Sequence, residues 1–244
     1  MKIHTKLTVF ALLLALWGGL AVSAEPGPRD RRPDDGAIII VIDPGHGGAD
    51  EGVKGPDGTL EKELMLELAR KIEARLVPDY EVHLTRDDDY QINLADRTGV
   101  ANTSRAALMI SLHAGAGFTP RADTTTVYTY LAPPPKPMPD TADGELPPPE
   151  QQWQHQQTRH QKESQRLGDL LAVRLFALPS APTVHKESGR LPVLAGADMP
   201  AVLLEFGDLN SAAGEKRLSA ADWQQQSAGA IAAAVREFLT TNPQ

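Results

Sequence analysis

The chain has 244 residues, of which 41% are hydrophobic, and this allows one large domain or two small ones with a sizeable core. Its formal net charge of −8 argues against nucleic acid and against an anionic membrane surface as partners, because both are negatively charged. The chain contains no cysteine, which excludes disulfides, thiolate metal sites, a cysteine nucleophile and a lipoprotein anchor.

Residues 1–24 have the pattern of a secretory signal peptide. Lys2 and Lys6 form a basic start, residues 7–21 form an apolar run, and a small-residue cleavage site ends at Ala24. A retained membrane anchor is the alternative, but the apolar run is short for a span and no basic stop signal follows it. We therefore expect a periplasmic or secreted protein with no stable membrane span after cleavage.

Residues 25–36 are charged and proline-rich, and we interpret them as a flexible lead-in. The apolar, β-branched run over residues 37–42 predicts a strand buried on both faces, as in a parallel sheet. Pro44 and three glycines then turn the backbone tightly. His46 in this turn stands beyond the carboxyl end of the strand, where open α/β sheets bind ligands. A glycine-rich turn with an incidental histidine is the alternative.

Residues 60–76 predict a helix, because leucine or isoleucine recurs at every fourth position. Glu61 falls on the apolar stripe of this helix, so its carboxylate points inward and needs a partner. Two interpretations stay open at this point. The carboxylate is either functional or a cap that accepts hydrogen bonds from N–H groups at the helix end.

The middle of the chain continues to alternate between strands and helices. Residues 81–86 predict a strand, and residues 91–104 have the spacing of a helix. Residues 107–112 predict a second buried strand, and His113 stands at its carboxyl end. A short strand is expected over residues 127–131.

Residues 132–150 contain eight prolines and few apolar residues, so we expect them to lie outside the sheet. Residues 151–177 predict a helix that becomes amphipathic in its second half, and residues 179–190 predict a loop. A third buried strand is expected over residues 201–204, and Glu205 stands at its carboxyl end.

A final helix is expected over residues 220–239, with an alanine-rich face that suits close packing on a sheet. The alternation of strands and helices predicts a single α/β domain whose mostly parallel, twisted sheet is flanked by helices.

Four side chains stand where they can form a metal site. His46, His113 and Glu205 each follow a buried strand, and carboxyl ends of parallel strands meet at one edge of the sheet. Glu61 opens the helix after the first loop. Two histidines and one carboxylate are a common set of ligands for catalytic zinc, and a second carboxylate can take a proton from water. The spacing does not match a short metal motif, so the residues alone leave open which carboxylate is the ligand.

Four motifs occur in a fixed order: Asp43-Pro44-Gly45-His46-Gly47-Gly48, Glu61-Lys62-Glu63-Leu64, Ser111-Leu112-His113-Ala114 and Met199-Pro200-Ala201-Val202-Leu203-Leu204-Glu205. In these motifs the chain resembles the zinc-dependent N-acetylmuramoyl-L-alanine amidases of the family-3 type, which cut bacterial peptidoglycan. The resemblance implies that His46, Glu61 and His113 bind Zn²⁺ and that Glu205 is the general base. It also implies a catalytic domain over residues 37–240.

The implied reaction is hydrolysis of the amide between N-acetylmuramic acid and the first L-alanine of the stem peptide, for cell-wall remodelling or daughter-cell separation. Two alternatives remain: another zinc hydrolase of the wall, such as a peptidase or deacylase, and a non-catalytic wall-binding domain. The chain departs from the family pattern at Gly115, Ala195, Asp208 and Asn210-Ser211. None of these positions is a proposed ligand, so they concern the shape of the substrate groove.

Residues 132–165 form an insertion, proline-rich first and helical later. In the family this region can carry a helix that blocks the zinc cleft until an activator protein displaces it. Here the insertion is either such a plug or a surface loop with no reach to the metal. The expected partners are therefore peptidoglycan and, in the first case, an activator.

Overall fold

The computed structural model describes residues 36–115, 124–134, 153, 155–179 and 183–241. The predicted signal peptide, nearly all of the lead-in and most of the proline-rich stretch lie outside the described residues, and their assignments stay predictions. None of the helices in the described part of the chain is long and apolar enough to cross a membrane.

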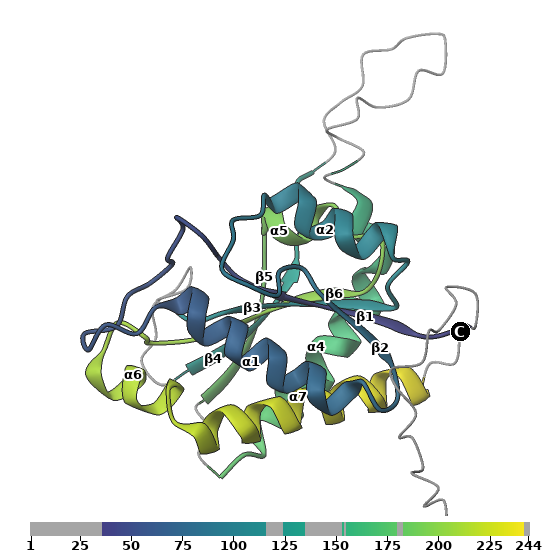
Figure 1. Ribbon diagram of the computed structural model, residues 1–244. Coiled ribbons are helices and arrows are strands. Elements are labelled where there is room, and N and C mark those ends of the chain that lie inside the picture. Colours follow the sequence, from purple (N-terminus) through teal and green to yellow (C-terminus); the bar gives the residue numbers. More distant parts are fainter. Residues whose placement is uncertain (1–35, 116–123, 135–152, 154, 180–182, 242–244) are drawn as a thin grey trace, which may run out of the picture. The chain divides into compact units, whose positions relative to one another are not determined.

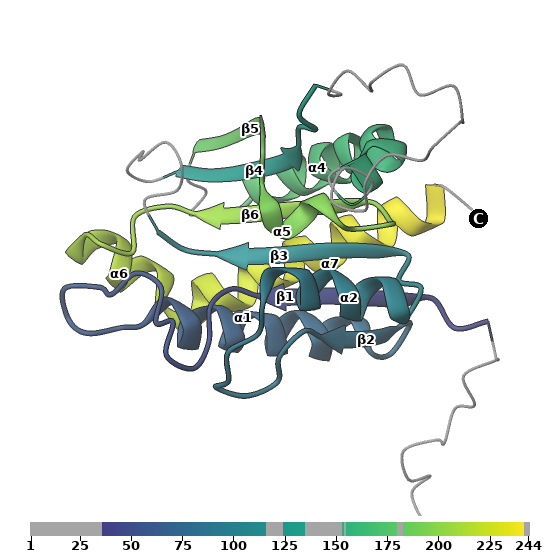
Figure 2. The same ribbon diagram turned by 90° about the horizontal axis from the view of Figure 1, so that it is seen from above.

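Six strands form one sheet in the order β2-β1-β3-β6-β4-β5 (Figure 2). Neighbouring strands are parallel except where β4 runs antiparallel to β6, which confirms the prediction of a mostly parallel sheet. The strands are β1 (Ile39–Pro44), β2 (Glu81–Leu84), β3 (Leu108–His113), β4 (Thr124–Tyr130), β5 (Thr183–Gly189) and β6 (Ala201–Phe206).

Helices cover both faces of the sheet (Figure 1). Helices α1, α4 and α7 pack on one face, and α2 and α5 pack on the other. The helices are α1 (Glu61–Leu76), α2 (Leu94–Thr103), the 3₁₀ helix η1 (Gln156–His160), α4 (Gln161–Phe176), α5 (Pro192–Ala195), α6 (Ala212–Leu218) and α7 (Ala221–Thr241).

Side chains alternate between the two faces along each central strand. In β1, Ile40 and Ile42 belong to the core beneath α1 and α7, whereas Val41 belongs to the core beneath α2 and α5. In β3, Leu108 and Met109 divide in the same way. Since both faces are covered, these strands are apolar throughout, and this is why the sequence predicts them well.

The structure corrects the prediction of a loop over residues 179–190, because β5 occupies Thr183–Gly189. Among the described strands β5 is at the edge of the sheet and pairs with β4 alone, so its side chains are largely polar and partly exposed. It therefore lacks the apolar run that marks a buried strand. The short helices α5 and α6 were also not predicted, and β4 begins at Thr124 rather than at residue 127.

Candidate active site

His46, Glu61 and His113 meet at the carboxyl edge of β1 and β3. Glu61 Oε1 lies 3.1 Å from His46 Nε2 and 3.1 Å from His113 Nδ1. One ligand atom from each residue lies within 4.8 Å of the other two. Donors around one tetrahedral zinc ion, with bonds of about 2.0–2.2 Å, stand roughly 3.3–3.6 Å apart. The three side chains thus offer a donor set that suits zinc, and their ligand atoms are close enough to bind one metal ion together.

The backbone after β1 is shaped to bring the histidines together. His46 has a positive φ of 59°, and Gly47 follows with a φ of 128°, so the chain turns sharply and carries the imidazole over the sheet edge. A Cβ at position 45 would overlap the ring of His113. Glycine at this position therefore permits the close approach of the two histidines, whose ring centroids are 4.9 Å apart.

A buried ion pair between Asp43 and Arg97 fixes the turn after β1. Asp43 is fully buried and accepts hydrogen bonds from Thr85 Oγ1 at 2.5 Å, Ser111 Oγ at 2.6 Å and Arg97 Nη1 at 2.8 Å. The other guanidinium nitrogen of Arg97, Nη2, donates to the carbonyl oxygen of His46 at 2.8 Å. Arg97 balances the charge of Asp43, and both carboxylate oxygens of Asp43 accept hydrogen bonds. The ion pair of Asp43 and Arg97 is therefore stable in the interior and holds His46 in place.

Arg86 secures the same turn from a second side. Its buried guanidinium donates to the carbonyl oxygens of Pro44, Gly45 and Lys62 at 2.7–3.0 Å. It thereby ties the turn after β1 to the first turn of α1. Neither Arg86 nor Arg97 was assigned a role from the sequence. The one available signal was the position of Arg97 on the apolar face of its helix.

Glu61 begins α1 and is 2% exposed. Its carboxylate accepts from Val53 N–H at 2.9 Å and from Ala114 N–H at 2.9 Å. These donors lie in a loop and after β3, so the carboxylate does not cap its own helix, and the capping interpretation is wrong. Burial by itself raises the pKa of Glu61, but hydrogen bonds and charges from His113 and His46 outweigh it and hold the pKa far below its usual range.

Glu205 lies beside His113 in the sheet. The two residues are register partners on the parallel strands β6 and β3, so their side chains point to the same face. Gly115 N–H donates to Glu205 Oε1 at 2.7 Å. Burial raises the pKa of Glu205, and the nearby carboxylate of Glu61 raises it further, against a lowering effect of His113. A carboxylate with a raised pKa suits a general base.

His46 also contacts a carboxylate outside the trio. Its Nδ1 lies 2.9 Å from Asp50 Oδ1, while Nε2 faces Glu61. Burial alone lowers the pKa of His46, but the two carboxylates outweigh it and raise the pKa to about 8. A carboxylate on the far nitrogen of a metal-binding histidine fixes its tautomer and orientation. Asp50 was not predicted from the sequence.

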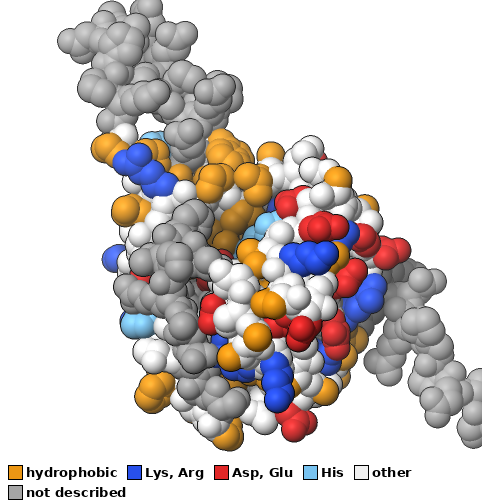
Figure 3. All heavy atoms as spheres, turned by 90° about the vertical axis from the view of Figure 1, so that its left-hand side faces the viewer, with side chains coloured by type: hydrophobic (Ala, Val, Ile, Leu, Met, Phe, Trp, Pro, Cys, Tyr) orange, Lys and Arg blue, Asp and Glu red, His pale blue; other side chains and the backbone are white. Residues whose placement is uncertain are grey.

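The four predicted residues line one cleft with a volume of about 430 Å³. The rest of its lining is almost entirely apolar, with Val53, Leu94, Leu191, Pro192, Val193 and Leu203. Figure 3 looks onto this edge of the molecule, where apolar side chains border one side of a hollow in which a histidine is visible. The structure thus brings together every residue that the sequence predicted for the site.

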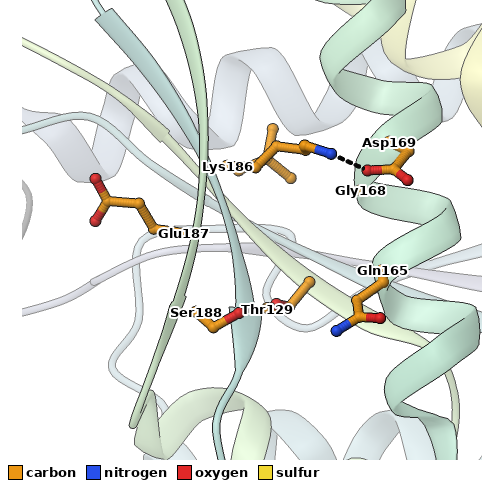
Figure 4. A pocket seen from close by; sticks show the side chains of 8 residues that line it. Thr129, Gln165, Gly168, Asp169, Lys186, Glu187 and Ser188 are labelled. Carbon is orange, nitrogen blue, oxygen red and sulfur yellow. Dashed lines mark hydrogen bonds and ion pairs between the residues drawn. The ribbon is translucent and has the colours of Figure 1, made fainter.

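A second cavity, of about 290 Å³, lies between β4, β5 and α4 (Figure 4). Four of its polar side chains are paired with each other, since Lys186 forms an ion pair with Asp169, and the hydroxyls of Thr129 and Ser188 are 2.8 Å apart. The potential metal ligands found among the described residues lie in the first cleft instead.

The positions that depart from the family pattern lie mostly outside the cleft. Gly115 lines the cleft, and a Cβ there would stand 3.6 Å from Glu205 Oε1. Ala195 is buried in α5. Asp208 and Ser211 form the entry to α6, where Ser211 Oγ accepts from Gly214 N–H at 3.0 Å. Only Gly115 is therefore in the cleft itself.

The chain matches the N-acetylmuramoyl-L-alanine amidase family over residues 40–237. It is 30% identical to the amidase AmiC of Neisseria meningitidis serogroup B, over 91% of this chain and 58% of that protein. It is 28% identical to AmiC of Escherichia coli O6:H1, over 88% of this chain and 56% of that protein. The chain thus spans somewhat more than half the length of these two relatives.

A solved structure has the same fold. The N-acetylmuramoyl-L-alanine amidase of Clostridium difficile 630 superposes with a TM-score of 0.68, at 25% identity, over 84% of this chain and 98% of that one.

Proposed function

Because the chain belongs to the N-acetylmuramoyl-L-alanine amidase family, we propose that it hydrolyses the amide between N-acetylmuramic acid and L-alanine in bacterial peptidoglycan. The observation that carries this proposal is the meeting of His46, Glu61, His113 and Glu205 in one cleft. The cellular role that we propose is cell-wall remodelling or daughter-cell separation. Peptidoglycan lies outside the cytoplasm, which fits the periplasmic or secreted location expected from residues 1–24.

His46, Glu61 and His113 would hold Zn²⁺, and this metal, when bound, supplies Lewis acidity for the scissile carbonyl and makes water more acidic. Glu205 takes the proton from the attacking water and returns it to the leaving amine of L-alanine. Its Oε1 is held by Gly115 N–H, so Oε2 is the oxygen that we expect to carry the proton. The apolar lining of the cleft limits the water around this carboxylate.

Two measurements test the proposal together. Metal analysis of purified protein should find about one zinc per chain. Mass spectrometry of digested peptidoglycan should find intact stem peptides that begin with L-alanine, and glycan with free lactyl groups. Fragments cut within the stem peptide would assign a peptidase instead, and loss of acetate would assign a deacylase. Intact peptidoglycan, with a zinc-loaded protein bound to it, would assign a wall-binding domain.

The substitution His113→Ala tests the ligand set. We expect the variant to lose zinc and keep a folded sheet, since His113 is at the end of β3 and remains partly exposed. Circular dichroism and metal analysis measure both properties. Full zinc retention would remove His113 from the ligand set, and His83→Ala, on β2, provides a matched control that should keep its zinc.

A further inference from the structure

The loop before α1 closes into a hairpin over residues 53–61. Glu61 N–H donates to the carbonyl of Val53 at 2.9 Å, and Gly55 N–H donates to the carbonyl of Thr59 at 2.9 Å. Both ends of the 53–61 hairpin belong to the cleft. Glu61 supplies the carboxylate of the trio, and Val53 donates its N–H to that carboxylate. A shift of this hairpin would therefore move Glu61 relative to the two histidines.

One buried acid from a distant part of the chain holds the turn of this hairpin. Glu215 is on α6 and is 3% exposed. Its Oε2 accepts from Asp57 N–H at 2.6 Å, and its Oε1 accepts from Thr59 N–H at 2.8 Å. These hydrogen bonds also lower the pKa of Glu215, so the group is an ionised carboxylate at neutral pH. Each of its oxygens satisfies one backbone donor.

The contact between the hairpin and Glu215 is close enough to require glycine. A Cβ at position 55 would overlap the carboxyl group of Glu215. Helix α6 is itself fixed at its start, where Ser211 Oγ accepts from Gly214 N–H and Asp208 N–H donates to the carbonyl of Gly115 at 3.0 Å. The acid thus links the hairpin to a segment that is already anchored beside the cleft.

We propose that Glu215 is a positioning residue for the metal centre, whose carboxylate clamps the 53–61 hairpin so that Glu61 meets His46 and His113. The proposal rests on the function proposed above. Glutamine cannot replace the acid, because its NH₂ group would face one of the two backbone N–H donors. One of the two hydrogen bonds from Asp57 N–H and Thr59 N–H is then lost, and the NH₂ group faces that N–H donor instead. The hairpin is no longer held at both backbone amides.

The substitution Glu215→Gln tests this role through zinc affinity, measured by competition with a chelator. Loss of a group that orients a metal ligand typically weakens metal binding by 10–100-fold, and we expect a zinc Kd about tenfold higher than that of the wild type. Glu237→Gln is the matched control, because Glu237 pairs with Arg174 on the exposed side of α7. It should leave the zinc Kd unchanged.

A second variant disturbs the same contact with Glu215 from the hairpin. Gly55→Ala should displace the carboxylate of Glu215 and weaken zinc binding to a similar degree. If both changes act through the same clamp, the double variant should bind zinc about as weakly as either single variant. Ile231→Val, in the core of α7, lowers stability without touching the hairpin and should keep the wild-type zinc Kd.

The outcomes separate this inference from the function on which it rests. Wild-type zinc affinity in Glu215→Gln would overturn the positioning role. So would weaker zinc binding in Ile231→Val, because it would show that lower stability alone reduces zinc affinity. Both results leave the amidase proposal standing as long as the wild type binds zinc and releases stem peptides. A wild type that binds no zinc would overturn the proposed function together with this inference.

Discussion

Two carboxylates of the cleft differ in what each one contacts, and this difference separates their roles. Glu61 contacts both His46 and His113, which hold its pKa far below the usual range. Glu205 is buried, accepts one hydrogen bond from Gly115 N–H among the described residues, and has a raised pKa. A carboxylate that stays ionised suits a metal ligand, and one with a raised pKa suits proton transfer. The contacts therefore support the assignment that the resemblance implied.

The substitution Glu205→Gln should abolish turnover and keep the zinc. The amide has nearly the same shape but cannot accept the proton of the attacking water, and loss of a general base typically costs about 10²–10⁴-fold in rate. Release of stem peptides from peptidoglycan and the zinc content measure the two effects. Near-normal activity would contradict the assignment of Glu205 as the general base.

Zinc binding should depend on pH through His46. The pKa of this side chain is raised to about 8 without metal, whereas a histidine that binds zinc is neutral. Below pH 8, zinc must therefore displace a proton, and the observed Kd should rise about tenfold for each unit that the pH falls. Above pH 8 His46 is already neutral, so the Kd should become constant. Chelator competition between about pH 6 and pH 9 measures this curve.

The variant Asp50→Asn supplies the control for this pH dependence. Asp50 is one of the two carboxylates that raise the pKa of His46, so its removal should move the bend of the curve to lower pH. A zinc Kd that does not change with pH in the wild type would contradict a protonated His46 in the metal-free protein.

Single residues also show where prediction from the sequence ends. Glu61 was predicted to point inward because it falls on an apolar stripe, and it is indeed buried. Arg86 and Glu215 were not predicted, because their partners are backbone groups from distant parts of the chain. No residue pattern marks such a partner. Sequence motifs identify the groups that carry the chemistry more readily than the groups that hold them in place.

Among the secondary-structure elements, those that form the site were predicted best. Strands β1, β3 and β6 are buried on both faces and appear in the sequence as apolar runs. The edge strand β5 has polar, partly exposed side chains, and the short helix α6 begins at a Ser211 cap without a long apolar stripe. Local sequence therefore predicts an element well when its burial is two-sided or its periodicity is long.

The turn after β1 carries His46 into the cleft, and Gly45→Ala tests its shape. The new Cβ would overlap the ring of His113, so we expect the histidines to separate and the zinc Kd to rise by about tenfold or more. Chelator competition measures the Kd. Gly99→Ala is the control, because a Cβ in α2 at that position meets no atom within 4 Å. Equal zinc affinity in Gly45→Ala would show that the turn adapts to the added carbon.

At the level of the whole molecule, the direction of β4 determines at which end of the sheet the 132–165 insertion begins. β4 runs opposite to β6, with Thr125 paired to Phe206 and Thr129 paired to Val202 (Figure 2). Tyr130, the last residue of β4, therefore lies near the amino end of β6, whereas Glu205 is near its carboxyl end. The sequence predicted both strands but not their relative direction, since an isolated strand carries no signal for its partner's orientation.

The described part of the insertion is also attached at that amino end. Gln157 is buried, and its Nε2 donates to the carbonyl of Met199 at 2.6 Å, just before β6 begins. Ser164 Oγ donates to Gln157 Oε1 at 2.7 Å and accepts from Ala201 N–H at 3.0 Å. The helical part of the insertion is thus attached at the amino end of β6, whereas Pro133 and Trp153, beside residues 135–152, share a pocket with Pro192, which also lines the cleft. The attachment of Gln157 and Ser164 away from the cleft is our reason to expect a surface loop, and the choice between loop and plug stays a prediction.

Replacing residues 135–150 with a Gly/Ser linker of equal length should therefore leave basal peptidoglycan hydrolysis unchanged. An extended chain spans about 3.3–3.6 Å per residue, so length alone would permit a segment of this size to reach across the sheet. The attachment of Gln157 and Ser164 at the amino end of β6 is what argues against a role in the cleft. A second variant should carry a shorter Gly/Ser linker, which is too short to reach the cleft but leaves the residues on either side of 135–150 unchanged. Hydrolysis that rises in both variants at equal zinc content would instead assign residues 135–150 a blocking role, and an activator protein would then be expected to act on them.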